Sequence, residues 1–438
     1  MWSFFINIMN KRILKLAIPN IISNITIPLL GMVDTALMGH LDSLIYIGAI
    51  ALGSMIFNFI YWGMGFLRMG TVGFTGQANG AKNKKEVSLV LYRSLSIAII
   101  AAVFLIIIHP FIINIGLSLT DSSVAIKNEA ANYFNIRIWA LPASLVILSF
   151  SGWFIGMQNT VYPMIISISS NLINILLSFI FVFGLDMKTE GVALGTVIAQ
   201  YVSMLIGIGF LLYKYKAFII RYHFVEVFNR QLTRLMNVNK DIFIRTLGII
   251  FVLSFFTIKS ANISDTTLAV NTILFQFFIF FSYLLDGFAN AGEALSSKSI
   301  GARNLKQLKL VINKTFLFGL GFSFIFSLVY FIWGENIIRI LTNNTDIINA
   351  STPLLFWVII LPFIAFPAFI YDGIYVGATA SKAMRNTMVI ASLFVFLPLV
   401  YLNIGNEITK LWVAFLAFLF SRGFLLFLSL KKSIYSLI

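Results

Sequence analysis

Long apolar runs separated by short polar segments dominate the chain. Twelve of these runs are long enough to cross a bilayer as helices, which takes about 20 apolar residues. They lie at 15–39, 45–72, 89–113, 130–156, 161–184, 191–213, 242–260, 266–292, 311–333, 350–377, 387–403 and 411–430. The runs do not alternate with the period of a strand, which favours helices over a β-barrel. The pattern predicts an all-α polytopic membrane protein with 12 transmembrane helices.

The composition agrees with this pattern. Of 438 residues, 59% are hydrophobic and only 11% are charged, and the mean hydropathy is +0.95. A soluble protein of this size could not bury so much apolar surface. The chain has no cysteine, and its three histidines lie far apart, so disulfides, thiolate chemistry and paired metal ligands are excluded. We expect no catalytic residues, no organic cofactor and no metal beyond Na⁺.

The basic residues are distributed unevenly between alternate loops. With the N-terminus inside, about three quarters of the 31 lysines and arginines lie in inner segments, among them Lys85, Arg93, Arg245 and Arg422. This is the positive-inside pattern of membrane proteins, and it accounts for the net charge of +15 without nucleic acid. It predicts cytoplasmic termini and, with no targeting signal, a bacterial inner membrane.

The sequence repeats itself weakly at a spacing of about 220 residues. Matched segments are Gly80-Ala81-Lys82-Asn83 with Gly301-Ala302-Arg303-Asn304, Leu141-Pro142 with Leu361-Pro362, and Gly152 and Gly156 with Gly373 and Gly377. Six spans repeated in the same orientation predict two pseudo-symmetric six-helix lobes, a plan that transporters use. We expect an N-lobe at 1–213, a cytoplasmic linker at 214–241 and a C-lobe at 242–438.

Four acidic residues fall in the predicted spans: Asp34, Asp286, Glu293 and Asp372. A carboxylate at the centre of a membrane helix costs roughly 2.5–3.5 kcal/mol, so it normally faces an internal cavity. Asp34 stands about six residues from the outer end of the first span. Pro28 precedes it and frees a backbone carbonyl, which makes a hinge there. Each acid could instead be a structural hydrogen-bond or ion-pair partner.

Neutral oxygens are expected at the depth of Asp34. The span at 161–184 carries Asn171, Asn174 and Ser178 on one face, and Thr196 lies at a similar depth in the next span. One carboxylate ringed by neutral oxygens suits a proton, or sodium if enough oxygens converge. The alternative is interhelical hydrogen bonding, worth about 0.6 kcal/mol on average.

The C-lobe carries further candidates. Asp286 and Glu293 are seven residues apart, so they share one helix face. Asp372 follows two prolines in the span at 350–377. The candidate ion or substrate residues of this lobe are Asp286, Glu293, Asp372, Gln276 and Tyr283. Arg68 and Lys259 are candidate counter-charges for the acids.

Several motifs occur in order along both halves. They are Pro28-Leu29-Leu30-Gly31-Met32-Val33-Asp34-Thr35-Ala36 with Gly39-His40-Leu41, Phe66-Leu67-Arg68-Met69-Gly70-Thr71 with Gln77-Ala78, Asn271-Thr272-Ile273-Leu274 with Gln276-Phe277-Phe278, Ser282-Tyr283-Leu284-Leu285-Asp286-Gly287-Phe288-Ala289 with Glu293-Ala294, and Asp372-Gly373-Ile374 with Gly377-Ala378-Thr379 and Met384-Arg385-Asn386. In these the chain resembles the multidrug and toxic compound extrusion (MATE) family, in its DinF-like branch. The resemblance implies a V-shaped pair of six-helix lobes that exports organic, often cationic, compounds against a proton or sodium gradient.

The resemblance also implies roles for single residues. Asp34 is the coupling carboxylate of the N-lobe, and its cation site includes Asn174, Thr196 and the backbone carbonyl of Val192. Ser178 stands where many relatives carry a second aspartate, and the loss of that charge favours protons over sodium. Asp372 matches an acid that other branches use for sodium, so sodium coupling in the C-lobe stays open.

We therefore expect a secondary-active efflux antiporter that works by alternating access with H⁺ or Na⁺. Its partners are small organic substrates and membrane lipid, without nucleic acid, and we expect a monomer. One alternative is a lipid-linked-precursor flippase of the same superfold, but apart from the charges assigned to inner segments only Arg68, Arg137 and Lys259 lie within or near spans to bind phosphates. Another alternative, a membrane-embedded transferase, would need clustered acids such as a DDxxD-like run, and the sequence has none.

Overall fold

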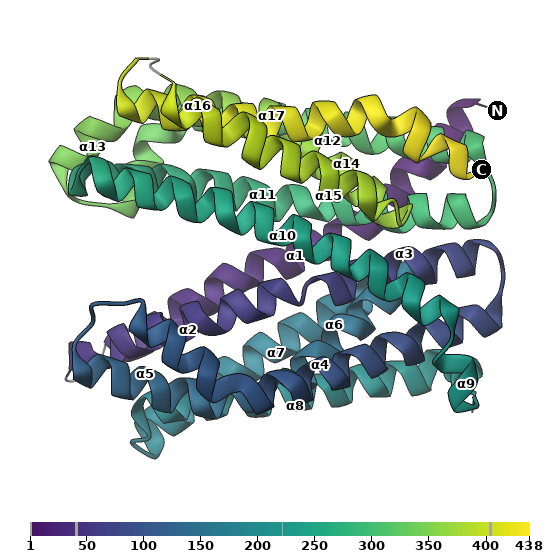
Figure 1. Ribbon diagram of the computed structural model, residues 1–438, viewed down its shortest axis with the longest axis horizontal. Coiled ribbons are helices and arrows are strands. Elements are labelled where there is room, and N and C mark those ends of the chain that lie inside the picture. Colours follow the sequence, from purple (N-terminus) through teal and green to yellow (C-terminus); the bar gives the residue numbers. More distant parts are fainter. Residues whose placement is uncertain (1, 40–42, 221, 403–404) are drawn as a thin grey trace. The chain divides into compact units, whose positions relative to one another are not determined.

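The computed structural model describes residues 2–39, 43–220, 222–402 and 405–438, with some side chains of the first helix left undescribed. Every regular element within these ranges is a helix (Figure 1). The α-helices of the first half are α1 (Trp2–Gly39), α2 (Leu44–Gly63), α3 (Phe66–Gly80), α4 (Lys84–Ser118), α5 (Val124–Arg137), α6 (Leu141–Gly156), α7 (Val161–Phe179), α8 (Lys188–Lys214) and α9 (Phe224–Val227). Those of the second half are α10 (Arg230–Ile263), α11 (Asp265–Gly301), α12 (Leu305–Leu341), α13 (Thr345–Ser351), α14 (Leu355–Gly377), α15 (Ser381–Val389), α16 (Leu397–Tyr401) and α17 (Glu407–Ser433). The all-α prediction is confirmed.

Eleven helical segments of the described chain are long and apolar enough to cross a membrane, judged by length and composition. They coincide with the second to twelfth predicted spans, because an apolar segment in lipid must satisfy its backbone groups internally and does so as a helix. The helical segments extend beyond the predicted apolar spans. The span at 242–260, for example, lies within the helix Arg230–Ile263. The first predicted span, 15–39, lies in α1.

The chain forms two compact units. The first, which we call the N-unit, is Ile22–Met236, and the second, the C-unit, combines Met1–Ile21 with Asn237–Ile438. The division falls at Met236, inside the segment 214–241 that the sequence assigns to a linker. The start of α1 belongs to the C-unit, whereas the sequence placed it in the N-lobe.

The internal repeat appears in the close approach of one helix pair within each unit. In the N-unit, a Cβ built on Gly152 of α6 would lie 2.4 Å from the carbonyl oxygen of Arg68 on α3. In the C-unit, a Cβ on Gly373 of α14 would lie 2.3 Å from the carbonyl oxygen of Ala289 on α11. Both helix pairs therefore pack backbone against backbone at matching positions, which is why glycine recurs there.

The turns after these helices repeat as well. Lys82 and Arg303 have φ values of +56° and +50°, in the left-handed region that ends a helix. The next residue in each copy caps the following helix: Asn83 accepts from the backbone N–H of Glu86, and Asn304 from that of Gln307. The two halves therefore repeat the same helix–turn–helix arrangement.

A first prediction concerns the glycine of the α11–α14 pair. Gly373→Ala is expected to lower stability by about 1–3 kcal/mol, because the new methyl group must push two backbones apart. Gly321→Ala on α12 is the matched control, since a Cβ there has nothing within 4 Å. Thermal unfolding of the purified variants in detergent measures both, and equal melting temperatures would contradict the close-packing argument.

The linker segment is attached to the N-terminal part of α4. Arg93, only 2% exposed, donates to the carbonyl oxygens of Val227 (3.1 Å) and Glu226 (3.2 Å) and pairs with Glu86 at 2.6 Å. Lys85 pairs with the Glu226 carboxylate at 2.6 Å. Charged residues that the sequence analysis counted only as inner positive charges thus hold the linker in place.

A second prediction follows from the Glu226 carboxylate. Its hydrogen bond from Lys85, followed by that from the His223 N–H, lowers the pKa of Glu226 from its ordinary value of 4.5. Because the folded pKa is depressed, the contact stabilises the attached linker above the unfolded pKa and is lost as pH falls through the folded pKa. The protection of residues 222–229 against hydrogen exchange, taken relative to the intrinsic rate at each pH, is expected to fall as the pH drops below 4.5. The protection of these residues in Glu226→Gln should not change over the same pH range.

Candidate functional site

A row of polar side chains joins α7 to α8 in the N-unit. The Nδ2 of Asn174 donates to the Oγ1 of Thr196 at 2.8 Å, and that hydroxyl donates to the carbonyl oxygen of Val192 at 2.9 Å. Gln200 extends the row by donating to the Oγ of Ser170 at 3.2 Å. The structure therefore brings together three residues that the sequence analysis grouped, Asn174, Thr196 and Val192.

Two buried polar atoms in this row have no hydrogen-bond partner in the described part of the chain. They are the Oδ1 of Asn174 and the Oγ of Ser178, on residues that are 2% and 0% exposed. An unpaired buried polar atom costs about 1–3 kcal/mol, so it marks a place where a ligand can bind. Gly195 makes room for Ser178: a Cβ there would lie 3.0 Å from both the backbone nitrogen and the Oγ of Ser178.

The backbone of α7 changes directly after this row. Ile180–Gly184 form a π-helical segment, which begins two residues beyond Ser178. The corresponding eleventh span also contains a π-helical segment, Ile390–Phe396. Single π-helical turns occur frequently at functional sites, because they rotate the following side chains out of the regular helical register.

Asn171 ties α7 to α1. Its Nδ2 donates to the Oγ1 of Thr26 at 2.8 Å and to the carbonyl oxygen of Thr26 at 3.2 Å. The helix α1 continues through Pro28 to Gly39. Asp34 lies on this helix, and its side chain is outside the described residues.

A triad of charged side chains forms the polar centre of the C-unit. The Oδ2 of Asp372 on α14 accepts hydrogen bonds from the guanidinium groups of Arg245 on α10 and Arg422 on α17. All three residues are buried, with 7%, 7% and 3% of their surface exposed. The two guanidinium groups neutralise Asp372 and leave one positive charge in excess.

The other C-lobe candidates lie on α11. Asp286 is half-buried and adds a favourable electrostatic interaction to Arg422. Glu293 is only 2% exposed, and its carbonyl oxygen would lie 2.3 Å from a Cβ on Gly377. Tyr283 is half-buried, whereas Gln276 is exposed. Exposure thus differs among the five candidates, from the buried Glu293 and Asp372 to the exposed Gln276.

Sequence reasoning missed the partners of Asp372. Arg245 and Arg422 were counted as inner, topology-setting charges, and Lys259 was named as a candidate counter-charge. In the structure Lys259 lies over the ring of Tyr401, with its Nζ 4.7 Å from the ring centre. Arg245 and Arg422 both fall inside predicted spans, at 242–260 and 411–430, and that placement is the signal that could have identified them.

The two centres have opposite chemistry. The N-unit row offers neutral oxygens to a cation, whereas the triad of the C-unit has already paired its carboxylate with two arginines. A second buried acid of the C-unit, Asp241, is also satisfied: its oxygens accept from Arg385 at 2.7 Å and Ser381 at 2.8 Å. Across the described residues, no three His, Asp or Glu side chains converge as metal ligands.

Comparisons with known sequences give matches along both halves of the chain. The family model described as MatE matches residues 19–180 and 242–402, one match in each half. The chain is 37% identical to the DNA damage-inducible protein F of Escherichia coli (strain K12), over 96% of this chain and 91% of that protein. It is 25% identical to the probable multidrug resistance protein NorM of Thermotoga maritima, over 78% of this chain and 74% of that one.

Solved structures show the same fold. The Vibrio cholerae MATE transporter VcmN in its bent form matches with a TM-score of 0.88 at 17% identity, over 99% of this chain and 98% of that one. An outward-facing multidrug resistance MATE family transporter matches with a TM-score of 0.89 at 16% identity, over 98% and 96%. At these identities the likeness speaks for the fold alone.

Proposed function

This chain belongs to the MATE family, in its DinF-like branch, and we propose that it exports organic, often cationic, compounds in exchange for protons. Family membership makes it a membrane-embedded efflux transporter for multidrug or toxic compounds and not an enzyme. The coupling ion, the antiport mechanism and the site residues are our proposal, as are an inner-membrane location with cytoplasmic termini and a monomeric state.

The observation that carries the proposal is the pair of unpartnered buried atoms, Asn174 Oδ1 and Ser178 Oγ. Asp34 belongs to the same level by helix register. The helices α1 and α7 hold the first and fifth predicted spans, which run in the same direction. The contact between Thr26 and Asn171 therefore sets which residues of the two helices lie at the same depth. Asp34 is eight positions beyond Thr26, and Ser178 is seven beyond Asn171. We assign Asp34 as the group that binds the coupling ion.

A proton fits this site better than sodium. Hard cations such as Ca²⁺ and Mg²⁺ take six or more oxygen ligands. Thr196 uses its hydroxyl to accept from Asn174 and to donate to Val192, so it has little capacity left for an ion. A single carboxylate with the two remaining neutral oxygens can hold a proton without a full coordination shell.

The proposed cycle uses the charge of Asp34 and the proline below it. Protonation from the outer side neutralises the carboxylate, and α1 then bends at Pro28 and expels the substrate from the N-lobe. The membrane potential supplies about 2.3 kcal/mol per charge per 100 mV, to which the pH gradient adds. The C-lobe candidates would then bind substrate or stabilise the fold of the C-lobe; they are Asp286, Glu293, Asp372, Gln276 and Tyr283.

The test is efflux of a fluorescent organic cation from proteoliposomes containing the full chain. A pH gradient and a sodium gradient are imposed separately, without the other. We expect export under the pH gradient alone. Export under sodium alone would overturn proton coupling and move attention to the C-lobe acids. No export under either gradient would overturn the choice of substrate and favour lipid-linked precursors.

A further inference from the structure

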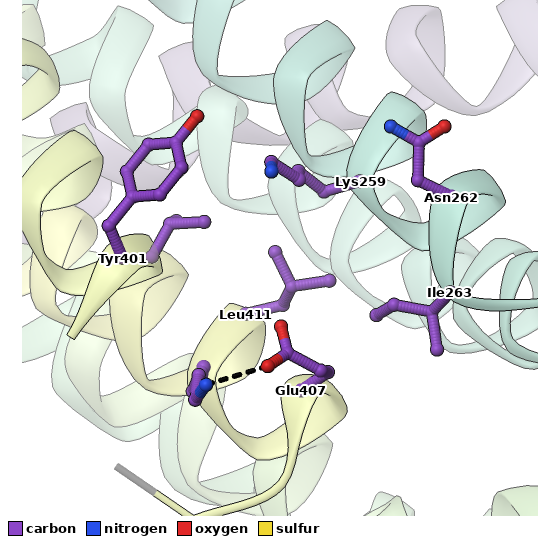
Figure 2. Close-up of a pocket in the computed structure, with 8 residues that line it drawn as sticks. Lys259, Asn262, Ile263, Tyr401, Glu407 and Leu411 are labelled. Carbon is purple, nitrogen blue, oxygen red and sulfur yellow. Dashed lines mark hydrogen bonds and ion pairs between the residues drawn. The ribbon is translucent and has the colours of Figure 1, made fainter. Parts of the chain in front are cut away.

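The C-unit contains a pocket whose lining includes none of the three residues of the triad. Its volume is about 530 Å³, within the range of roughly 300–1,000 Å³ typical of small-molecule sites. Figure 2 shows the pocket where the last turn of α10, the end of α16 and the first turn of α17 meet. The lining residues are Lys259, Asn262, Ile263, Val400, Tyr401, Glu407, Lys410 and Leu411.

The charged groups of the pocket leave a positive excess. Lys410 pairs with Glu407 at 2.6 Å, and its side chain is only 9% exposed. Lys259 contacts aromatic rings, with Nζ 4.7 Å from the ring centre of Tyr401 and 5.9 Å from that of Phe255. No carboxylate of the described chain forms an ion pair with Lys259. Two lysines against the single carboxylate of Glu407 leave a net charge of +1 in the lining, so the pocket favours an anionic group.

The other side of the pocket is apolar. Ile263, Val400 and Leu411 line it, and Tyr401, which is 65% exposed, opens it to the surface. Leu402, the residue after Tyr401, is 49% exposed. The pocket lies at the ends of helices that are apolar enough to span a membrane, where lipid headgroups meet the hydrocarbon core. A ligand that fits has an anionic head and an apolar tail.

We propose that this pocket binds the headgroup of an anionic phospholipid, with the phosphate beside Lys259 and the acyl chains along Tyr401 and Leu402. By the predicted topology the lipid belongs to the outer leaflet. Phosphate chemistry is shared with soluble phosphate esters, and the apolar side of the pocket is the reason for choosing the lipid. The proposal does not depend on which gradient drives transport.

Native mass spectrometry of the purified full chain tests the proposal. The probes are phosphatidylglycerol, phosphatidylcholine with the same acyl chains, and soluble glycerol 3-phosphate. We expect phosphatidylglycerol to bind more tightly than phosphatidylcholine, and Lys259→Gln to weaken its binding about fivefold, the contribution of one lysine near an anionic surface. Lys259→Arg should restore binding, which separates loss of charge from loss of fold.

Lys188→Gln is the matched control, because Lys188 is an exposed lysine that also lies over a tyrosine, 5.4 Å from the ring centre of Tyr46. This control should bind phosphatidylglycerol as the unmodified chain does. Equal weakening in Lys188→Gln and Lys259→Gln would overturn the site, as would equal affinity for the two lipids. Displacement of the lipid by an equal concentration of glycerol 3-phosphate would overturn the lipid assignment and leave a soluble phosphate as the ligand.

Discussion

Asp34→Asn is expected to abolish efflux driven by a pH gradient while leaving substrate binding in place. Asparagine keeps the size of the side chain but cannot take up or release a proton, so α1 loses the protonation step that the pH gradient drives. Export driven by the pH gradient should therefore fall to the background of liposomes without the protein. Proteoliposome efflux and substrate binding in detergent measure the two effects separately.

The matched control for this variant is Asp121→Asn, which changes an exposed acid in the same unit. It should transport at the rate of the unmodified chain. Asn174→Leu is expected to reduce coupling as well, because it removes the Oδ1 that faces the site together with the hydrogen bond to Thr196. Full gradient dependence in Asp34→Asn would show that the N-unit row is a structural contact between helices and would end its assignment as the ion site.

Asp372→Asn is expected to destabilise the C-unit by about 3–5 kcal/mol, the usual cost of removing one partner from a buried ion pair. Arg245 and Arg422 would then face one another, buried, without the carboxylate that bridges them. The matched control is Asp241→Asn, because its partner Arg385 is 30% exposed at the side chain and can be solvated. Unfolding in detergent, followed by heat or by denaturant, should show a much smaller loss for this control.

The triple variant Arg245→Met, Asp372→Leu and Arg422→Met separates structure from function. Replacing a whole buried charge cluster by apolar residues is often neutral for stability, so the triple variant should regain most of what Asp372→Asn loses. If it also transports normally, Asp372 serves the packing of α10, α14 and α17. If it folds but does not transport, the surplus positive charge of the triad acts on substrate or ion. Equal stability of Asp372→Asn and Asp241→Asn would contradict the triad argument.

Hydropathy alone determined much of the fold. It located the spans, because burial of a helix in lipid depends on local sequence and not on the rest of the chain. The recurrence of Gly152 and Gly373 disclosed the repeat, since backbone contact tolerates no other residue. The grouping of Asn174 with Thr196 was also predictable, because α7 and α8 follow one another through a short turn and depth can be counted along each helix.

Only the tertiary structure decided which charges meet. The two partners of Asp372 lie 127 and 50 residues away in the chain, on helices that the sequence does not place next to α14. Lys259, inside an apolar run like both arginines, contacts Tyr401 instead. The sequence reports the depth of a residue in the membrane, but not the rotation of its helix or the neighbours that the helix packs against. An ion pair depends on the depth of both residues, on the rotation of their helices and on which helices pack together.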